Sequence, residues 1–281
     1  MNERIITNDQ IADYAAHLHS EERAPGTIEK YLRDARSFAV WLDGAPVTKE
    51  NATGWKEQLR AQGYAPATIN SMLAALNNLF RFLSWNECHM KFLKIQRRLF
   101  RDTARELTRT EYEQLIRTAE AQGKHRLALL MEAICATGIR VSEVRYLTVE
   151  AAKAGRAVIS LKGKIRTILI PNKLCRKLLK YAKKQKIASG EIFLTKSGKS
   201  ISRRQIWAEM KGLCKAAGVA ASKVFPHNFR HLFATAFYRA CKDIVKLADV
   251  LGHSSIETTR IYLLTSGEEH QRQLDRLGLV S

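Results

Sequence analysis

The amino-terminal third of the chain carries apolar side chains at intervals of three and four positions, the spacing of one face of an α-helix. Two such runs follow the similar segments APGTI and APATI, at residues 24–28 and 65–69. In each segment a threonine, Thr27 or Thr68, is predicted to be the helix N-cap, because the preceding proline disfavours an earlier start. We therefore expect residues 1–98 to form an all-helical domain whose apolar faces pack into a small bundle.

The segment after this bundle is dense in arginine and only weakly periodic. Its sequence, KIQRRLFRDTARELTRTEY, spans residues 94–112 and ends in a helix start at Thr108 or Thr110. We interpret residues 99–107 as a basic linker between two domains. This linker either follows a phosphate backbone or is a solvated run of charge, and the sequence leaves both interpretations open.

From residue 108 to residue 281 the pattern is mixed. Helical spacing recurs in several stretches, and short apolar runs beside turn residues predict strands. The predicted helices cover residues 110–121, 124–136, 141–147, 172–186, 202–218, 227–240, 243–252 and 255–264. The predicted strands are 157–161 and 167–171, joined by a turn at 162–166, and a further strand at 191–195. This pattern predicts a mostly helical α+β domain with a small antiparallel sheet.

The charge balance narrows the range of functions. The 281 residues include 47 Lys and Arg against 27 Asp and Glu, which gives a net charge of +20 and a pI near 10.0. The basic residues are spread along the chain, so we expect a positive folded surface that binds a polyanion, above all nucleic acid. A membrane surface is not the expected partner, because the sequence has no basic amphipathic anchor.

The sequence also lacks targeting and cofactor motifs. The start, MNERIITNDQ, has no signal-peptide core, and no apolar run approaches the roughly 18 residues of a membrane span, which predicts a cytoplasmic protein. Five cysteines, odd in number and widely separated, favour reduced thiols over disulfides or a zinc site. No histidine pair has metal-ligand spacing and no glycine loop could cradle a phosphate, so neither a metal nor a nucleotide cofactor is expected.

Four polar clusters interrupt the apolar helical patterns. Arg140 opens a helix with Glu143 three residues later, which suits it to hold an anion. His227 lies one helical turn before Arg230 on the same face, whereas His231 is expected to point elsewhere. Taken singly, each cluster is also consistent with a solvated or structural role. The clusters are TGIRVSE with Arg140, the solvated-looking turn LKGKIR with Lys162, Lys164 and Arg166, HNFRH with His227 and Arg230, and LGHSSIETTRIY with His253 and Tyr262.

The combination and order of these clusters resemble the tyrosine recombinase, or phage integrase, family over residues 110–265. The resemblance implies a site-specific recombinase that cuts and rejoins double-stranded DNA through a 3′-phosphotyrosyl intermediate and a Holliday junction, without ATP. It further implies a DNA-clamping core-binding domain at residues 1–98, a catalytic domain at residues 108–281, and a tetramer assembled on two DNA sites. A type IB topoisomerase and a DNA-binding regulator with a retired active site remain as alternatives.

The resemblance also implies a role for each matched residue. The tyrosine would attack the scissile phosphorus, and the two arginines would clamp its non-bridging oxygens with the later histidine as a further donor. The earlier histidine would exchange the proton of the tyrosine or assist at the phosphate. Lys162 would protonate the leaving 5′-oxygen, with Lys164 in the same turn as the alternative. The six predicted catalytic residues are Arg140, Lys162, His227, Arg230, His253 and Tyr262.

Overall fold

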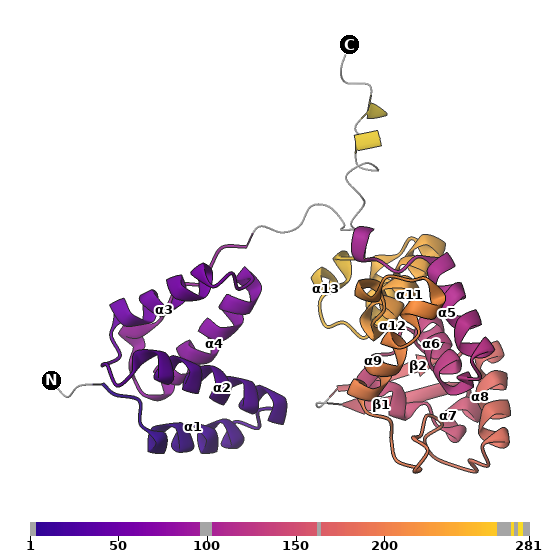
Figure 1. Ribbon diagram of the computed structural model, residues 1–281, viewed down its shortest axis with the longest axis horizontal. Coiled ribbons are helices and arrows are strands. Elements are labelled where there is room, and N and C mark those ends of the chain that lie inside the picture. The colour runs from indigo at the N-terminus through magenta and orange to yellow at the C-terminus, as the bar shows by residue number, and fades with distance from the viewer. Residues whose placement is uncertain (1–3, 96–102, 162–163, 263–270, 273–274, 278–281) are drawn as a thin grey trace. The chain divides into compact units, whose positions relative to one another are not determined.

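The chain divides into two compact units, Met1–Arg97 and Arg98–Ser281, called unit 1 and unit 2 (Figure 1). The predicted linker falls partly on residues 99–102, which lie outside the described residues, so its course along DNA stays a prediction. The computed structural model describes residues 4–95, 103–161, 164–262, 271–272 and 275–277.

Unit 1 is built from helices, as predicted. The starts of α2 and α4 differ from the prediction, because Ala24 and Ala65 are the N-cap residues, not Thr27 and Thr68. Both helices begin at a proline, which is favoured in the first helical position because its missing N–H would have no partner there. The helices are α1 Asn8–Ser20, α2 Pro25–Leu42, α3 Lys49–Ala61 and α4 Pro66–Phe82, followed by a 3₁₀ turn at Asn86–Cys88.

The apolar faces of these helices meet in one core. Phe38 of α2 is fully buried, and its ring contacts Trp55 of α3 and Phe80 of α4 at centroid distances of 5.3 and 5.9 Å. Tyr14 of α1 is also buried and donates its hydroxyl hydrogen to the side-chain oxygen of Asn78 at 2.6 Å. The predicted bundle core is confirmed.

Unit 2 is mostly helical with one small sheet, as predicted. α5 begins after Thr108, one of the two predicted starts, which caps the helix through its side chain. The predicted helix 141–147 is a 3₁₀ helix, Val141–Tyr146, and not an α-helix. The predicted helix 202–218 divides in two at Gly212. The helices are α5 Arg109–Ala121, α6 His125–Thr137, α7 Val149–Ala154, α8 Asn172–Lys184, α9 Arg203–Lys211, α10 Cys214–Ala217, α11 Pro226–Cys241, α12 Ile244–Leu251 and α13 Ile256–Arg260, with 3₁₀ helices at Thr103–Arg105, Val141–Tyr146 and Ala221–Lys223.

The sheet is a hairpin of two antiparallel strands, β1 Arg156–Leu161 and β2 Lys164–Leu169. The second strand begins closer to the turn than predicted, so Arg166 lies within β2, opposite the buried Ile159. Opposed residues of a pair share one face of a sheet, and Arg166 is therefore on the core side of the hairpin. The predicted strand at residues 191–195 is wrong, because this segment makes only isolated bridges.

α6 is the central helix of unit 2, and α5, α8 and α11 pack around it. A smaller apolar cluster forms between α11 and α12 and includes Tyr262. The end of α6, the start of α11 and the end of α12 therefore come together at one place, where the candidate site lies. The buried side chains of α6 are Leu127, Ala128, Leu129, Leu130, Met131, Ala133, Ile134 and Thr137.

Candidate active site

Arg230 occupies the centre of the site and is only 2% exposed. Its Nη1 donates to the carbonyl of Gly138 after α6, and its Nη2 donates to the last carbonyl of α12 at 2.8 Å and to Nε2 of His253 at 3.0 Å. Burial, followed by the charge of Arg140, lowers the pKa of Arg230 to about 10, while the nearby Tyr262 acts in the opposite direction. The guanidinium therefore stays cationic at neutral pH and joins three segments that are distant in the sequence.

Arg140 keeps one edge open to solvent, with 39% of its side chain exposed. Its Nη1 lies 3.1 Å from Oε1 of Glu143, and its Nη2 donates to the carbonyl of Gly252 at 3.3 Å. Its backbone N–H donates to Oε2 of Glu143 at 2.8 Å at the start of the 3₁₀ helix. The guanidinium is thus held in place from behind, while its open edge can be reached by an incoming anion.

Glu143 is a buried carboxylate that binds two arginines at once. Besides Arg140, it accepts from Nη2 of Arg166 at 2.6 Å, and Nη1 of Arg166 donates to the carbonyl of Val250 at 3.2 Å. Burial alone would raise the pKa of Glu143, but the Arg140 N–H and the two guanidinium groups lower it below its ordinary value. The interpretation of Arg166 as part of a solvated turn is wrong. The signal that could have placed it inside is its spacing of two from the apolar Ile168 in one strand.

Two glycines let the backbone approach these arginines. Gly138 and Gly252 end α6 and α12 with φ values of +64° and +62°, a left-handed conformation that favours glycine. A Cβ on Gly138 would overlap the ring of Phe233, and a Cβ on Gly252 would overlap the side chain of Arg166. Glycine at both positions leaves room for these side chains, and both glycine carbonyls accept from arginines of the site.

His253 has a partner on each ring nitrogen. Nε2 lies 3.0 Å from Nη2 of Arg230, and Nδ1 lies 2.9 Å from Oγ1 of Thr259. A guanidinium can only donate, so Nε2 accepts and the ring proton is on Nδ1. Burial, followed by the charge of Arg230, lowers the pKa of His253 to about 4, so the ring is neutral at pH 7. In this arrangement Nε2 is an acceptor, and it must change role before His253 can donate to a phosphate as predicted.

Tyr262 belongs to the same cluster and is 3% exposed. Its ring stacks on His253 with a centroid distance of 6.1 Å, and the ring of His231 meets it edge-on at 4.9 Å. The phenol lies close enough to Arg230 to oppose the lowering of the pKa of that guanidinium. The expectation that His231 points away from the site is wrong, because the segment that carries Tyr262 folds against α11 and covers this histidine.

The remaining predicted residues are His227 and Lys162. His227 is at the mouth of the site in the first turn of α11, and partial burial, followed by the charges of Arg230 and Arg140, lowers its pKa. Its ring is therefore neutral at pH 7 and can accept a proton. Lys162 lies outside the described residues, as does the side chain of Lys164. The structure thus brings five of the six predicted residues together, while their catalytic roles stay predictions.

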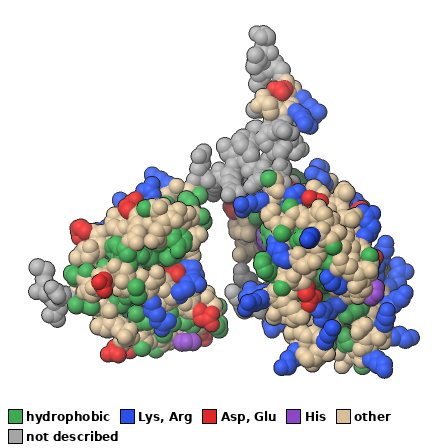
Figure 2. Space-filling view, viewed as in Figure 1, with side chains coloured by type: hydrophobic (Ala, Val, Ile, Leu, Met, Phe, Trp, Pro, Cys, Tyr) green, Lys and Arg blue, Asp and Glu red, His purple; other side chains and the backbone are tan. Residues whose placement is uncertain are grey.

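The positive charge is unevenly divided, contrary to the expectation that it is spread along the chain. Unit 2 carries 35 Lys and Arg against 16 Asp and Glu, whereas unit 1 carries 12 against 11. Figure 2 shows Lys and Arg side chains over much of the visible face of unit 2. The long-range attraction for a polyanion therefore comes mainly from the unit that contains the site. Within the described part of the chain, every helix is too short or too polar to cross a bilayer.

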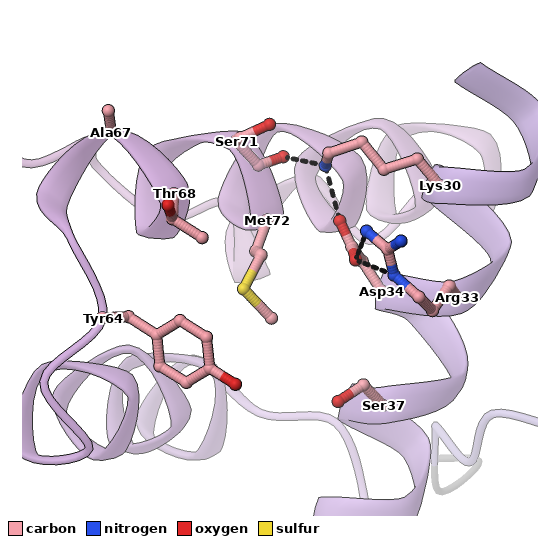
Figure 3. A pocket seen from close by; sticks show the side chains of 9 residues that line it. All are labelled: Lys30, Arg33, Asp34, Ser37, Tyr64, Ala67, Thr68, Ser71 and Met72. Carbon is pink, nitrogen blue, oxygen red and sulfur yellow. Dashed lines mark hydrogen bonds and ion pairs between the residues drawn. The ribbon is translucent and has the colours of Figure 1, made fainter. Parts of the chain in front are cut away.

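A separate hollow lies in unit 1 between α2 and α4 (Figure 3). Nζ of Lys30 lies 2.5 Å from Oδ2 of the buried Asp34 and donates to the carbonyl of Ser71 at 2.9 Å, which links the two helices. Nη2 of Arg33 donates to Oδ1 of the same carboxylate at 3.2 Å. This surface offers two positioned cations and several hydroxyl groups, which are the contacts that phosphates accept. The hydroxyl groups that line the hollow belong to Ser37, Tyr64, Thr68 and Ser71.

Two family models match the chain. The model described as "Phage integrase family" matches residues 105–269, and the model described as "Phage integrase, N-terminal SAM-like domain" matches residues 11–87. The first covers more than half of the chain and includes every residue of the site described above. The fold is that of a tyrosine-type site-specific recombinase. The chain belongs to the phage integrase family, which confirms the resemblance predicted from its motifs.

Individual relatives agree with this assignment. The chain is 28% identical over 289 residues to the tyrosine recombinase XerA of Pyrococcus furiosus, across 100% of this chain and 98% of that protein. Its structure is similar to that of the XerH site-specific recombinase bound to difH substrate in a pre-cleavage complex (TM-score 0.68, 18% identity, 98% of this chain and 90% of that one). It is also similar to a lambda integrase tetramer bound to a Holliday junction (TM-score 0.74, 18% identity, 93% of this chain and 78% of that one). The two structural matches show a shared fold.

Proposed function

We propose that the chain is a site-specific DNA recombinase that cuts and rejoins double-stranded DNA through a 3′-phosphotyrosyl intermediate and a Holliday junction, without ATP. The observation that carries this proposal is the convergence of Arg140, Arg230, His253 and Tyr262, from four separate segments, at one cationic site. Two guanidinium groups beside a phenol are suited to hold a phosphodiester and to attack it. Membership of the phage integrase family supports the same reaction.

The two arginines would hold the non-bridging oxygens of the scissile phosphate. Negative charge grows on these oxygens in the transition state, and prepositioned donors stabilise it most effectively. Arg140 presents its open edge, whereas the position of Arg230 is set by two backbone carbonyls and His253. Arginine suits this role because its planar fork can donate two hydrogen bonds at once.

Tyr262 would be the nucleophile. Its phenolic oxygen forms a bond to phosphorus as the bond from phosphorus to the 5′-oxygen breaks, and the phenolic proton passes to His227. Lys162 would give a proton to the leaving 5′-oxygen, with Lys164 as the alternative donor. A 5′-hydroxyl from the same or a partner strand then reverses the step. The phosphotyrosyl link conserves the energy of the phosphodiester, so no ATP is consumed.

Access to the nucleophile would require a movement. Tyr262 is buried against α11 and α12, so a phosphorus atom bound by the arginines meets its phenol only after the segment that carries it shifts. Tyr262 lies two residues after the end of α13, and that helix is only five residues long, so a small displacement of one element could supply the shift.

The DNA partner and the assembly follow from the same proposal. Unit 1 would clamp the duplex, with the Lys30 and Arg33 surface of Figure 3 against phosphates, and unit 2 would supply most of the electrostatic attraction. Four copies would act on two specific DNA sites in the cytoplasm. The tetrameric lambda integrase on a Holliday junction supports this arrangement.

Two alternatives make different predictions. A type IB topoisomerase would relax supercoiled DNA without exchanging strands between duplexes, so short substrates that carry two sites separate it from a recombinase. A DNA-binding regulator would form no covalent link to DNA at all. Arg140, Arg230 and His253 are held by the hydrogen bonds described above, and His227 and Tyr262 lie beside them, which favours an active site over a retired one.

The decisive experiment traps the covalent intermediate. The bound sequence is first recovered from a library of randomised duplexes, and a nicked version of it is incubated with the protein and denatured in SDS. The parent should form an SDS-resistant complex and Tyr262→Phe should form none while binding DNA with unchanged affinity. Tyr238→Phe, which alters a tyrosine of the same apolar cluster, is the matched control and should behave like the parent. A covalent complex that persists in Tyr262→Phe would show that the nucleophile lies elsewhere.

A further inference from the structure

Thr259 connects the two halves of the site although it carries no predicted role. It is 0% exposed and lies in α13, three residues before Tyr262. Its hydroxyl is 2.9 Å from Nδ1 of His253, and its backbone carbonyl accepts the N–H of Tyr262 at 3.0 Å. Thr259 therefore contacts both His253, a candidate phosphate ligand, and the backbone of Tyr262, the candidate nucleophile.

The hydrogen-bond directions around His253 depend on this hydroxyl. Because Arg230 has no acceptor, Nε2 accepts from it, and the proton on Nδ1 must be donated to Oγ1 of Thr259. The opposite tautomer would place an N–H of His253 against an N–H of Arg230. The hydroxyl is therefore the acceptor that the inferred Nδ1–H tautomer requires.

A phosphate at the site would reverse these directions. Its oxygens would accept hydrogen bonds from the N–H groups of Arg230, and Nε2 of His253 could then interact with the phosphate only as a hydrogen-bond donor. A neutral ring with its proton on Nε2 needs a donor at Nδ1, whereas a protonated ring still needs an acceptor there. A hydroxyl can serve as either, but a carboxylate or a backbone carbonyl can only accept.

We propose that Thr259 is a positioning residue, which holds His253 in its acceptor form toward Arg230 and allows it to become a donor to the scissile phosphate without losing its second partner. This inference rests on the proposed function. It distinguishes Thr259 from a residue that only fills space, because valine has nearly the same shape but cannot exchange a hydrogen bond.

The tautomer can be measured on the free full-length protein, without DNA. Long-range proton–nitrogen spectra of histidine labelled with ¹⁵N report which ring nitrogen carries the proton, and the signals of His253 are those lost in His253→Ala. The parent and Thr259→Ser should show a neutral ring protonated on Nδ1, and Thr259→Val should lose this pattern. Thr258→Val, at the exposed neighbouring threonine, is the matched control and should match the parent. A parent ring protonated on Nε2, or an unchanged spectrum in Thr259→Val, would overturn the assignment.

The consequence for catalysis is measured as the single-turnover rate of covalent complex formation. Thr259→Val should be slower than the parent by roughly 10–100-fold. This is the loss expected for the one hydrogen bond that His253 would donate to the charged scissile phosphate. Thr259→Ser should stay within about threefold of the parent, because it keeps the hydroxyl, and DNA affinity should be unchanged in both.

A double-mutant cycle separates positioning from a structural role. If Thr259 acts through His253, Thr259→Val should change the rate of the His253→Ala variant by less than about threefold. A full loss in that background would mean that the hydroxyl supports α13 itself, and the proposal would be wrong. A parent that forms no covalent complex would refute the proposed function alone, since the tautomer assignment would still stand on the spectra. A parent that forms the complex, together with a fully active Thr259→Val, would refute only this inference.

Discussion

Replacing Glu143 by glutamine tests whether the arginine cluster depends on one buried carboxylate. Glutamine keeps the length and volume of the side chain but replaces one acceptor oxygen by an NH₂ group. That group would face donors of Arg140 or Arg166, which cannot accept from it. The substitution also leaves the guanidinium charges of Arg140 and Arg166 without a counter-charge.

The expected loss of stability follows from the burial of these groups. Removing one partner of a buried ion pair costs about 3–5 kcal/mol. Arg140 is partly solvated and glutamine retains one acceptor, so the lower limit applies, and we expect a loss of about 3 kcal/mol. This is a large part of the roughly 5–15 kcal/mol by which an ordinary domain is stable. Glu132→Gln, which breaks the partly exposed pair with Lys177 at 2.5 Å, should cost less than about 1 kcal/mol.

The assay is urea unfolding followed by circular dichroism, at constant ionic strength. The unfolding midpoint of unit 2 should fall by about 1 M or more in Glu143→Gln, while the transition of unit 1 is unchanged and serves as a reference. Because the pKa of Glu143 lies below its ordinary value of 4.5 in the folded protein, its contribution is complete above that pH and is lost as the pH falls through the folded pKa. The difference between the parent and the variant should therefore shrink on acidification. A loss equal to that of Glu132→Gln at neutral pH would refute the reasoning.

Four further predictions concern individual features. Gly252→Ala should destabilise unit 2 by roughly 2–4 kcal/mol, because of the left-handed φ and because the new Cβ would overlap the side chain of Arg166. Gly155→Ala, with a similar φ of +69° and open space around it, should cost only about 1–2 kcal/mol. Equal losses of stability in thermal unfolding would refute the steric contribution. Arg140→Lys should bind DNA but cleave it at least about 100-fold more slowly, because lysine cannot donate from a planar fork, and near-parental cleavage would reduce Arg140 to a source of positive potential. The logarithm of DNA affinity should fall with the logarithm of salt concentration at a slope of about −5 or steeper if six or more phosphates are neutralised, and a slope shallower than about −2 would contradict an extensive DNA clamp. Lys162→Ala should cleave ordinary DNA roughly 10²–10⁴-fold more slowly and recover on a substrate whose bridging 5′-oxygen is sulfur, since a thiolate leaves without a proton; selective recovery of Lys164→Ala would exchange the two roles.

Much of this protein could be predicted from local patterns. The helices α5, α6, α8, α11 and α12 follow from apolar spacing, because their buried faces repeat with the period of the helix itself. The order of Arg140, Lys162, His227, Arg230, His253 and Tyr262 is sufficient to recognise the family. Short elements were less predictable. Residues 191–195 have the composition of a strand but make only isolated bridges.

Only the tertiary structure determined which groups of the site are hydrogen-bonded to each other. The hydrogen bond from Arg140 to the carbonyl of Gly252 joins residues 112 positions apart, and no local pattern contains that distance. The spacing of two from Ile168 indicates an inward side chain for Arg166, but the carboxylate that it binds comes from another segment, which no local pattern reveals. The direction of the His253 hydrogen bonds depends on Arg230, 23 positions earlier, and on Thr259. Sequence determines which side chains are available, whereas packing determines which donors face which acceptors, because buried polar groups must find partners wherever the fold places them.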